Sequence, residues 1–395
     1  MLNTLKNNFH EKITLILSLL ILNNYFLLSL NIPIFIIKIN FLLFIFIIAT
    51  FYFKNVNENI YLKIFFLFIV FITLGTPAYG WDARSIWLFH AKRIFYDGSI
   101  FSVADNYAPY SNNEYPSLAP AFASSLSALV GYWNEVFPKL SFTLMFLPPL
   151  ILTYVLLKKT QYLIFLSIVF FTIGKFMVNG WLDGLVAIYF GLSALLMYIL
   201  FIKSDNKFKN KSLYYYISFC FFVSLTLLKD EGVVLLLILF ATTILVKIFI
   251  KNFKKDIFKL ILLSSSFLPI IMWKLFCHYK GMDNHHINLD PNVFLRFYDL
   301  NNYKLISYFV ILNEKFLICL TFFLLSFWIN WNKEIFSFIF ISTIMYLLVL
   351  FFVFLTTPFD FYWQLDSTAA RVVRSLNFSL ALFGLYNLNN KINDV

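Results

Sequence analysis

The sequence is dominated by apolar stretches long enough to cross a lipid bilayer, which needs roughly 20 residues per helix. They cover residues 13–30, 34–53, 64–79, 138–157, 162–178, 184–202, 213–228, 232–250, 258–276, 316–331, 335–355 and 371–388. This pattern predicts an all-α, polytopic transmembrane bundle of about 12 helices.

Composition excludes a soluble globular domain. Of the 395 residues, 61% are hydrophobic and 13% are charged, which is too little charge to cover a soluble domain of this length. The net charge of +11 does not indicate a nucleic-acid partner, because the lysines sit in short runs between apolar segments. The cysteines, Cys220, Cys277 and Cys319, show no paired spacing and are predicted to be inert, buried thiols.

The chain shows no internal division. No period of 20–50 residues repeats and no flexible linker interrupts it, so residues 1–395 are predicted to form a single integral membrane domain. The first apolar stretch lacks a small-residue cleavage site and is followed at once by the second. We therefore expect an uncleaved helix there and not a signal peptide.

The distribution of lysine predicts the orientation. If the N-terminus is cytoplasmic, every dense lysine run falls on the cytoplasmic side, as the excess of Lys and Arg in cytoplasmic loops requires. These lysines are Lys6, Lys12, Lys54, Lys63, Lys158, Lys159, Lys203, Lys207, Lys209, Lys211, Lys251, Lys254, Lys255 and Lys259. The long loop 80–139 and the loop 358–370 then lie on the outer face, and both termini lie inside. The apolar segment 116–130 is predicted to be a helix at the outer interface, because a further span there would place Lys158 and Lys159 outside.

The most informative outer stretch, residues 80–93, reads GWDARSIWLFHAKR and opens where the third apolar stretch ends. Asp82 lies at the mouth of a membrane helix, where partial desolvation favours a carboxylate as a base and where an unused acid is costly. Trp81 and Trp87 offer flat apolar faces that suit a sugar ring or an interfacial anchor equally. The basic residues suit a phosphate group or the same anchoring role: Arg84, Lys92 and Arg93.

A second stretch, residues 112–120, reads NNEYPSLAP. Glu114 either caps the helix that follows, whose N-terminus favours negative charge, or faces Asp82 across the loop. In the second case it would polarise the acceptor or share a divalent cation, Mg²⁺ or Mn²⁺, with Asp82.

Smaller groups of polar residues lie between later apolar stretches. Asp183 caps the sixth stretch or joins the site. Lys229, Asp230 and Glu231 must face a polar cavity or one another. Three histidines with two nearby acids lack diagnostic ligand spacing and do not predict a metal site: His278, His285, His286, Asp283 and Asp290.

The last outer loop ends in two arginines. Arg371 and Arg374 are three residues apart, share a helix face and are well placed for a lipid phosphate. The alternative is that both are snorkelling anchors at the membrane edge.

Together these stretches resemble the GT-C glycosyltransferases, integral-membrane enzymes that use polyprenyl-phosphate-linked sugars. The closest likeness is to the bacterial branch related to dolichyl-phosphate-mannose protein mannosyltransferases. The family's W-D-A-x-x-x-W-x-x-K-A-K is similar to residues 81–92, and its H-P-D-Y-P-x-L-x-P to residues 112–120. Residues 228–232 resemble its L-K-N-E-G turn, and residues 363–371 resemble its W-H-L-x-x-S-x-x-R.

The chain departs from the family pattern at three positions within these motifs, which cover about a tenth of its length. Glu114 replaces Asp, His90 replaces Lys and Gln364 replaces His. The first change keeps the charge and moves it by one methylene, which puts any metal geometry in doubt. Four motifs in the family's order, all on the side selected by the lysine distribution, make the likeness moderately specific.

The resemblance implies inverting sugar transfer from a polyprenyl-phosphate donor to a glycan, lipid or protein acceptor, on the outer face of a bacterial inner membrane. Asp82 would be the general base and Glu114 would assist. Lys229, Arg371 and Arg374 would hold the leaving phosphate. Trp87, Tyr115 and Trp363 would pack the sugar. The full set of candidate substrate-binding residues is Arg84, Trp87, Lys92, Tyr115, Asp183, Lys229, Glu231, Trp363, Arg371 and Arg374.

Other functions remain open at this point. A transporter or flippase for a lipid-linked glycan would need ionisable residues in mid-helix, for which Lys38 and Lys175 are the main candidates. A glycan polymerase or ligase would normally carry a larger late outer loop. A structural membrane protein is a further alternative.

Overall fold

The computed structural model describes residues 8–54, 59–157, 159–203, 211–249, 256–282, 293 and 295–391. Every element in these ranges is a helix, which confirms the all-α prediction. The first half contains α2 (Phe9–Ser29), α3 (Ile34–Phe53), α4 (Ile60–Gly75), α5 (Leu88–Asp97), α6 (Leu118–Val130), α7 (Val136–Leu144), α8 (Leu147–Leu156), α9 (Lys159–Ile173) and α10 (Asp183–Met197). The second half contains α11 (Lys211–Leu228), α12 (Asp230–Phe249), α13 (Ile257–Ser264), α14 (Leu268–Tyr279), α16 (Leu300–Val310), α17 (Glu314–Ile329), α18 (Lys333–Leu355), α19 (Phe361–Val372) and α20 (Arg374–Lys391).

Eight helical segments of the described chain are long and apolar enough to cross a membrane, so the chain is a helical membrane protein. They are Phe9–Ser29, Ile34–Phe53, Val136–Leu156, Asp183–Ile202, Lys211–Leu228, Asp230–Phe249, Ile257–Tyr279 and Lys333–Leu355. A ninth exists if α16 and α17, which meet at a bend of 70°, count as one span. The predicted number of about 12 is not confirmed, because segments such as Ile60–Gly75 are shorter than a full span.

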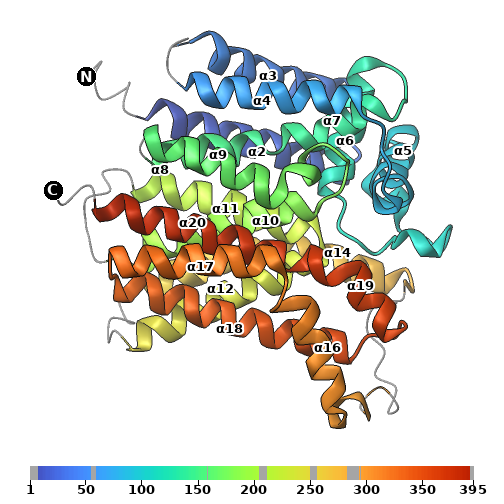
Figure 1. Cartoon of the computed structure of the whole chain (residues 1–395). Coiled ribbons are helices and arrows are strands. Elements are labelled where there is room, and N and C mark those ends of the chain that lie inside the picture. The colour runs from blue at the N-terminus through green and yellow to red at the C-terminus, as the bar shows by residue number, and fades with distance from the viewer. Residues whose placement is uncertain are drawn as a thin grey trace.

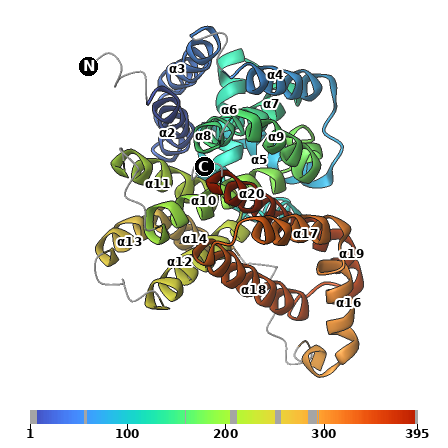
Figure 2. The same cartoon turned by 60° about the vertical axis from the view of Figure 1, so that its left-hand side comes forward.

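The helices run side by side, and the beginning of α2 and the end of α20 lie at the same end of the bundle (Figure 1). Helices α5, α14, α16 and α19 lie toward the opposite end. Helix α10 occupies the middle, beside α11, α12 and α20 (Figure 2), and each of its residues from Asp183 to Met197 is buried. Asp183, the first residue of α10, therefore lies at one end of the most enclosed helix.

The outer helices carry large apolar side chains on their exposed surfaces. Phe35 and Phe46 of α3, Phe71 of α4 and Leu348 of α18 are each between 65% and 69% exposed. Such a surface would be unstable in water and is typical of contact with lipid. The exposed faces of α3, α4 and α18 are therefore the lipid-facing sides of the bundle.

Helix α6 forms the helix that was expected over residues 116–130. It begins at Leu118, and its residues from Leu118 to Ala128 are all buried. It packs against α2, α3, α5 and α7. The segment is apolar because protein covers it on nearly all sides, and apolar composition alone does not distinguish protein from lipid as the surrounding medium.

Several predictions concern residues outside the described ranges. These are the charge-bearing residues Lys6, Lys158, Lys207, Lys209, Lys251, Lys254 and Lys255, and the polar residues Asp283, His285, His286 and Asp290. The three cysteines are described, and all are free and buried, as predicted.

Candidate functional site

Arg371 joins acidic residues from two distant parts of the chain. It lies in the last turn of α19, and its Nε and Nη2 donate to Oδ2 of Asp183 at 3.2 and 3.0 Å. Its Nη2 also donates to Oδ2 of Asp82, which lies just before the π-helical turn η1 (Ala83–Trp87). Two carboxylates that the sequence placed in separate motifs therefore meet on one guanidinium group.

Lys229 extends this arrangement toward α12. Its Nζ donates to Oδ1 of Asp183 at 3.0 Å and lies 3.8 Å from Oε2 of Glu231. The Tyr346 hydroxyl of α18 donates to Oε1 of Glu231 at 2.8 Å. We call the five charged residues, Asp82, Arg371, Asp183, Lys229 and Glu231, the charge network.

The charge network is largely enclosed by protein. The side chain of Asp183 is 3% exposed, and those of the other four members are between 15% and 18% exposed. Burial alone would lower the pKa of Lys229, but the carboxylates of Asp183 and Glu231 outweigh it and raise that pKa. Burial likewise opposes the charge of Arg371, and Asp183 and Asp82 raise its pKa above the usual value. Both cations therefore remain charged among the three acidic side chains of the network.

Trp181 covers the guanidinium of Arg371, whose central carbon lies 4.2 Å from the centre of the ring. The turn that carries Trp181 approaches the backbone just before Asp82 so closely that a Cβ on Gly80 would lie 1.5 Å from the indole Nε1. Only glycine fits at position 80 without moving Trp181. Glycine at position 80 thus allows the backbone to pass close to Trp181 and allows the carboxylate of Asp82 to contact Arg371.

Glu114 is held by a second polar group centred on α14. Its backbone carbonyl accepts from Trp273 Nε1 at 2.9 Å and from Lys274 Nζ at 3.1 Å. The same Lys274 nitrogen donates to Oδ2 of Asp230 at 2.7 Å. Lys274 therefore ties the loop that carries Glu114 to the turn that carries Lys229 and the charge network.

Tyr115 lies between the two polar groups. Its ring stacks on Trp87 with centres 5.5 Å apart and planes at 14°. Burial, followed by the negative charges of Asp230, Glu114 and Asp82, raises the pKa of Tyr115 well above its usual value. The phenol therefore stays protonated, and the charges of both predicted catalytic acids act on it.

His90 fixes the long loop 80–139. Its Nε2 is 3.0 Å from Oδ1 of Asn113, whose amide donates to the carbonyls of Asp105 and Tyr107 at 2.8 and 2.6 Å. Complete burial lowers the pKa of His90 to about 4, despite its bond with Asn113. A neutral imidazole thus anchors the segment that leads into Glu114.

Other predicted site residues lie apart from the charge network. Arg84 and Lys92 are exposed and form no hydrogen bond or ion pair with described residues. Trp363 is 57% exposed and meets Phe359 edge to face.

Arg374 lies beside the network without contacting it. A break at Val373 separates α19 from α20, and Arg374 Nη1 donates to the Thr172 carbonyl at 2.9 Å. The predicted pairing of Arg371 and Arg374 on one ligand therefore needs revision, because the two side chains have different partners.

Four residues of these groups were missed in the sequence: Trp181, Trp273, Lys274 and Tyr346. Lys274 carried a usable signal, since an ionisable residue inside an apolar stretch is costly and often functional. The three aromatic residues carried none, because aromatic side chains are frequent throughout this sequence.

The described residues do not favour a metal ion between the acids. They contain no group of three or more His, Cys, Asp or Glu side chains suited to hold one. Arg371 already occupies the position between Asp82 and Asp183. The charge network is therefore centred on the guanidinium of Arg371.

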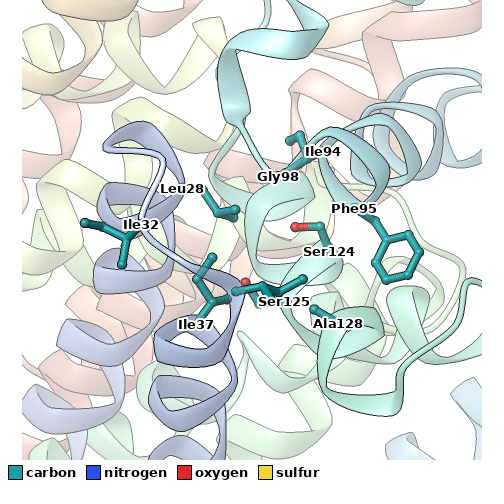
Figure 3. Close-up of a pocket in the computed structure, with 10 residues that line it drawn as sticks. Leu28, Ile32, Ile37, Ile94, Phe95, Gly98, Ser124, Ser125 and Ala128 are labelled. Atoms are coloured by element: carbon teal, nitrogen blue, oxygen red, sulfur yellow. The ribbon is translucent and has the colours of Figure 1, made fainter.

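A small, partly open pocket lies elsewhere, between the α2–α3 turn and helices α5 and α6 (Figure 3). Apolar side chains such as Ile37 and Ile94 line it, together with Ser124 and Ser125. Both serine hydroxyls donate to the Ala121 carbonyl of their own helix. None of the predicted site residues lines this pocket.

Fold and site together define a helical membrane protein with a buried network of charges joining the ends of its helices. No protein-family model, curated protein or solved structure matches the chain.

Proposed function

We propose that this chain is a GT-C-like glycosyltransferase that moves a sugar from a polyprenyl-phosphate donor to an acceptor hydroxyl. The reaction would take place on the outer face of a bacterial inner membrane, with both termini in the cytoplasm. One observation carries the proposal: Arg371 contacts Asp82 across 289 residues of sequence and Asp183 across 188. The acid of the first motif and the arginine of the last motif thus belong to one polar site.

In the proposed reaction Asp82 is the general base. The acceptor oxygen attacks the anomeric carbon, a new carbon–oxygen bond forms, and the bond from that carbon to the donor phosphate breaks. The acceptor proton passes to Oδ1 of Asp82, which accepts no hydrogen bond from the described residues, while Oδ2 stays on Arg371. Attack from the side opposite the phosphate inverts the anomeric configuration.

Arg371 would couple proton transfer to departure of the phosphate. When Asp82 takes up the proton, it no longer neutralises Arg371, and the network becomes more positive by one unit of charge. Negative charge develops on the phosphate at the same time, so a more strongly positive Arg371, together with Lys229, stabilises it. Nη1 of Arg371 has no partner among the described residues and is the donor proposed for a phosphate oxygen.

The aromatic residues take different parts in this proposal. Trp87 and Tyr115 are buried against each other. In this proposal their role is to support the positions of Asp82 and Glu114. Trp81 and Trp363 are more than half exposed and offer faces on which a sugar can pack. Glu114 assists by setting the position of Tyr115 and the loop.

The test is sugar transfer by the purified chain in proteoliposomes, with a panel of radiolabelled undecaprenyl-phosphate sugars as donors. Asp82→Asn should reduce transfer on the order of 10²–10⁴-fold, because the amide cannot accept the proton. Asp97→Asn is the matched control, since Asp97 is an exposed acid on the same loop. Transfer by Asp82→Asn at the rate of the unchanged protein would disprove the assignment of the base.

Orientation is tested separately with Tyr110→Cys, because Tyr110 is 84% exposed on the long loop and the native cysteines are buried. A membrane-impermeant thiol reagent should label this variant in intact spheroplasts. Protection there, with labelling after lysis, would place the loop in the cytoplasm and exclude a site on the outer face.

A further inference from the structure

Three basic residues meet where α9, α17 and α20 come together. Lys315, in the first turn of α17, donates to the Phe171 carbonyl at 2.9 Å. Arg374, the first residue of α20, donates to the neighbouring Thr172 carbonyl at 2.9 Å. Lys175 lies in the 3₁₀ turn η4 (Gly174–Met177) that follows α9, and the charges of both Arg374 and Lys175 act on Lys315. We call these three residues the basic cluster.

No acid of the described chain neutralises the basic cluster. None of its members forms an ion pair with a described residue. The charge of Asp183 reaches Arg374, but that carboxylate is already shared by Lys229 and Arg371. Glu314 is adjacent to Lys315 on α17, and successive helix residues point in different directions. Lys315 and Arg374 stack on the rings of Phe171 and Phe176, at 5.1 and 3.9 Å from the ring centres, but no carboxylate of the described chain pairs with any of the three cations.

Helix capping explains only part of this arrangement. Lysine and arginine often donate to the last carbonyls of a helix, as Lys315 and Arg374 do at the end of α9. Capping does not account for Lys175, which is exposed and has no partner among described residues. Nor does it account for the Nε of Arg374, which is buried and has no hydrogen-bond partner in the described chain. Lys175 is therefore the member of the basic cluster that is most open to a ligand.

The surface beside the basic cluster is apolar and open. Phe170 and Phe171 at the end of α9 are 64% and 41% exposed, and Ile318 of α17 is 54% exposed. A ligand that fits both features carries a negative head and a hydrocarbon chain. Phosphate suits the head, because its oxygens accept several charge-assisted hydrogen bonds from Arg and Lys.

We propose that Lys175, Lys315 and Arg374 bind the phosphate group of a membrane lipid, whose chain lies along Phe170 and Ile318. Two lipids share this chemistry: an anionic phospholipid and a polyprenyl phosphate. The site does not rest on the proposed sugar transfer, since its donors are not the residues that bond to Asp82 and Asp183. If the basic cluster prefers the polyprenyl lipid, it holds a substrate beside the charge network. If it prefers the phospholipid, the basic cluster anchors the protein to membrane lipid.

The test is lipid binding to the full-length protein in neutral detergent, measured by native mass spectrometry. Phosphatidylglycerol and undecaprenyl phosphate are the two phosphate probes, and diacylglycerol is the probe without phosphate. Each basic residue near a membrane surface contributes about fivefold in affinity, so Lys175→Gln with Lys315→Gln should weaken the preferred phosphate probe about 25-fold. Binding of diacylglycerol should not change.

Lys280→Gln with Lys333→Gln is the matched control, because both lysines are exposed and lie elsewhere in the fold. Lys175→Arg with Lys315→Arg should retain binding. If the double glutamine variant does not fold, Lys175→Gln alone tests the site, since Lys175 has no described contact to lose, and about a fivefold loss is expected. Unchanged binding of both phosphate probes, or an equal loss in the control variant, would overturn the proposal.

Discussion

Replacement of Asp183 by asparagine tests whether the charge network is held by its most buried acid. Asp183 is the member on which both cations converge, with Lys229 on one oxygen and Arg371 on the other. Removing one partner from a buried ion pair costs about 3–5 kcal/mol. After Asp183→Asn, Arg371 keeps Asp82, and Lys229 keeps Glu231 at 3.8 Å. Because neither cation is left alone, we expect a loss near the lower end, about 3 kcal/mol in the free energy of unfolding.

The assay is reversible unfolding in mixed micelles of neutral detergent and dodecyl sulfate, applied to a double-mutant cycle. The variants are Asp183→Asn, Arg371→Met and their combination, with Asp97→Asn as a control that removes an exposed acid. Since Asp183 and Arg371 are in direct contact, the two single losses should fail to add by about 1–3 kcal/mol. A loss below about 0.5 kcal/mol for Asp183→Asn, or simple additivity, would refute the view that this pair is a tightly coupled buried contact.

Three further predictions follow from other parts of the site. Sugar transfer should persist in EDTA, because Arg371 and Lys229 supply the positive charge; a loss restored by Mg²⁺ or Mn²⁺ would assign Asp82 and Glu114 to a metal. Lys274→Met should slow transfer about tenfold to a hundredfold by releasing Glu114 from Asp230, whereas Lys280→Met, measured in the same initial-rate assay, should not. The pKa of His90 is lowered from 6.5 to about 4 in the folded protein. On acidification the imidazole is therefore protonated in the unfolded chain before it is protonated in the folded protein. The free energy of unfolding should then fall by about 3 kcal/mol between pH 6.5 and 4. His90→Gln should remove that part of the pH dependence of the unfolding midpoint, and an identical profile would contradict it.

Hydropathy located the helices well, whereas the predicted number of about 12 spans is not confirmed. The second apolar stretch, 34–53, coincides with α3, because lipid thickness sets the length of a helix exposed to the bilayer. The count is not confirmed at segments such as α4, with 16 residues, and α6, which protein surrounds. In both, neighbouring helices determine where the segment begins and ends, and a one-dimensional apolar average contains no record of those neighbours.

The candidate site was predictable as a set of residues and not as a set of contacts. Asp82, Asp183, Lys229 and Arg371 each drew attention because a charge at a helix end in a membrane protein is costly. Their pairing was not predictable, since the contact between Asp82 and Arg371 spans 289 residues and depends on how the helices pack. Lys274 was overlooked because it lies inside an apolar stretch whose average hides a single charge.

The energetics of the charge network favour a functional interpretation over a purely structural one. Buried ion pairs cost desolvation, and apolar residues of similar volume often stabilise a fold equally well or better. This chain is 61% hydrophobic, and the surroundings of the network, including Trp181 and Tyr346, already contain large side chains that could fill the space. Stability alone therefore gives no reason to assemble three carboxylates and two cations from four separate segments at the end of the central helix. A reaction that moves a proton onto one carboxylate while negative charge grows on a phosphate does give such a reason, because it requires acid and cation to be coupled in a place that excludes most water.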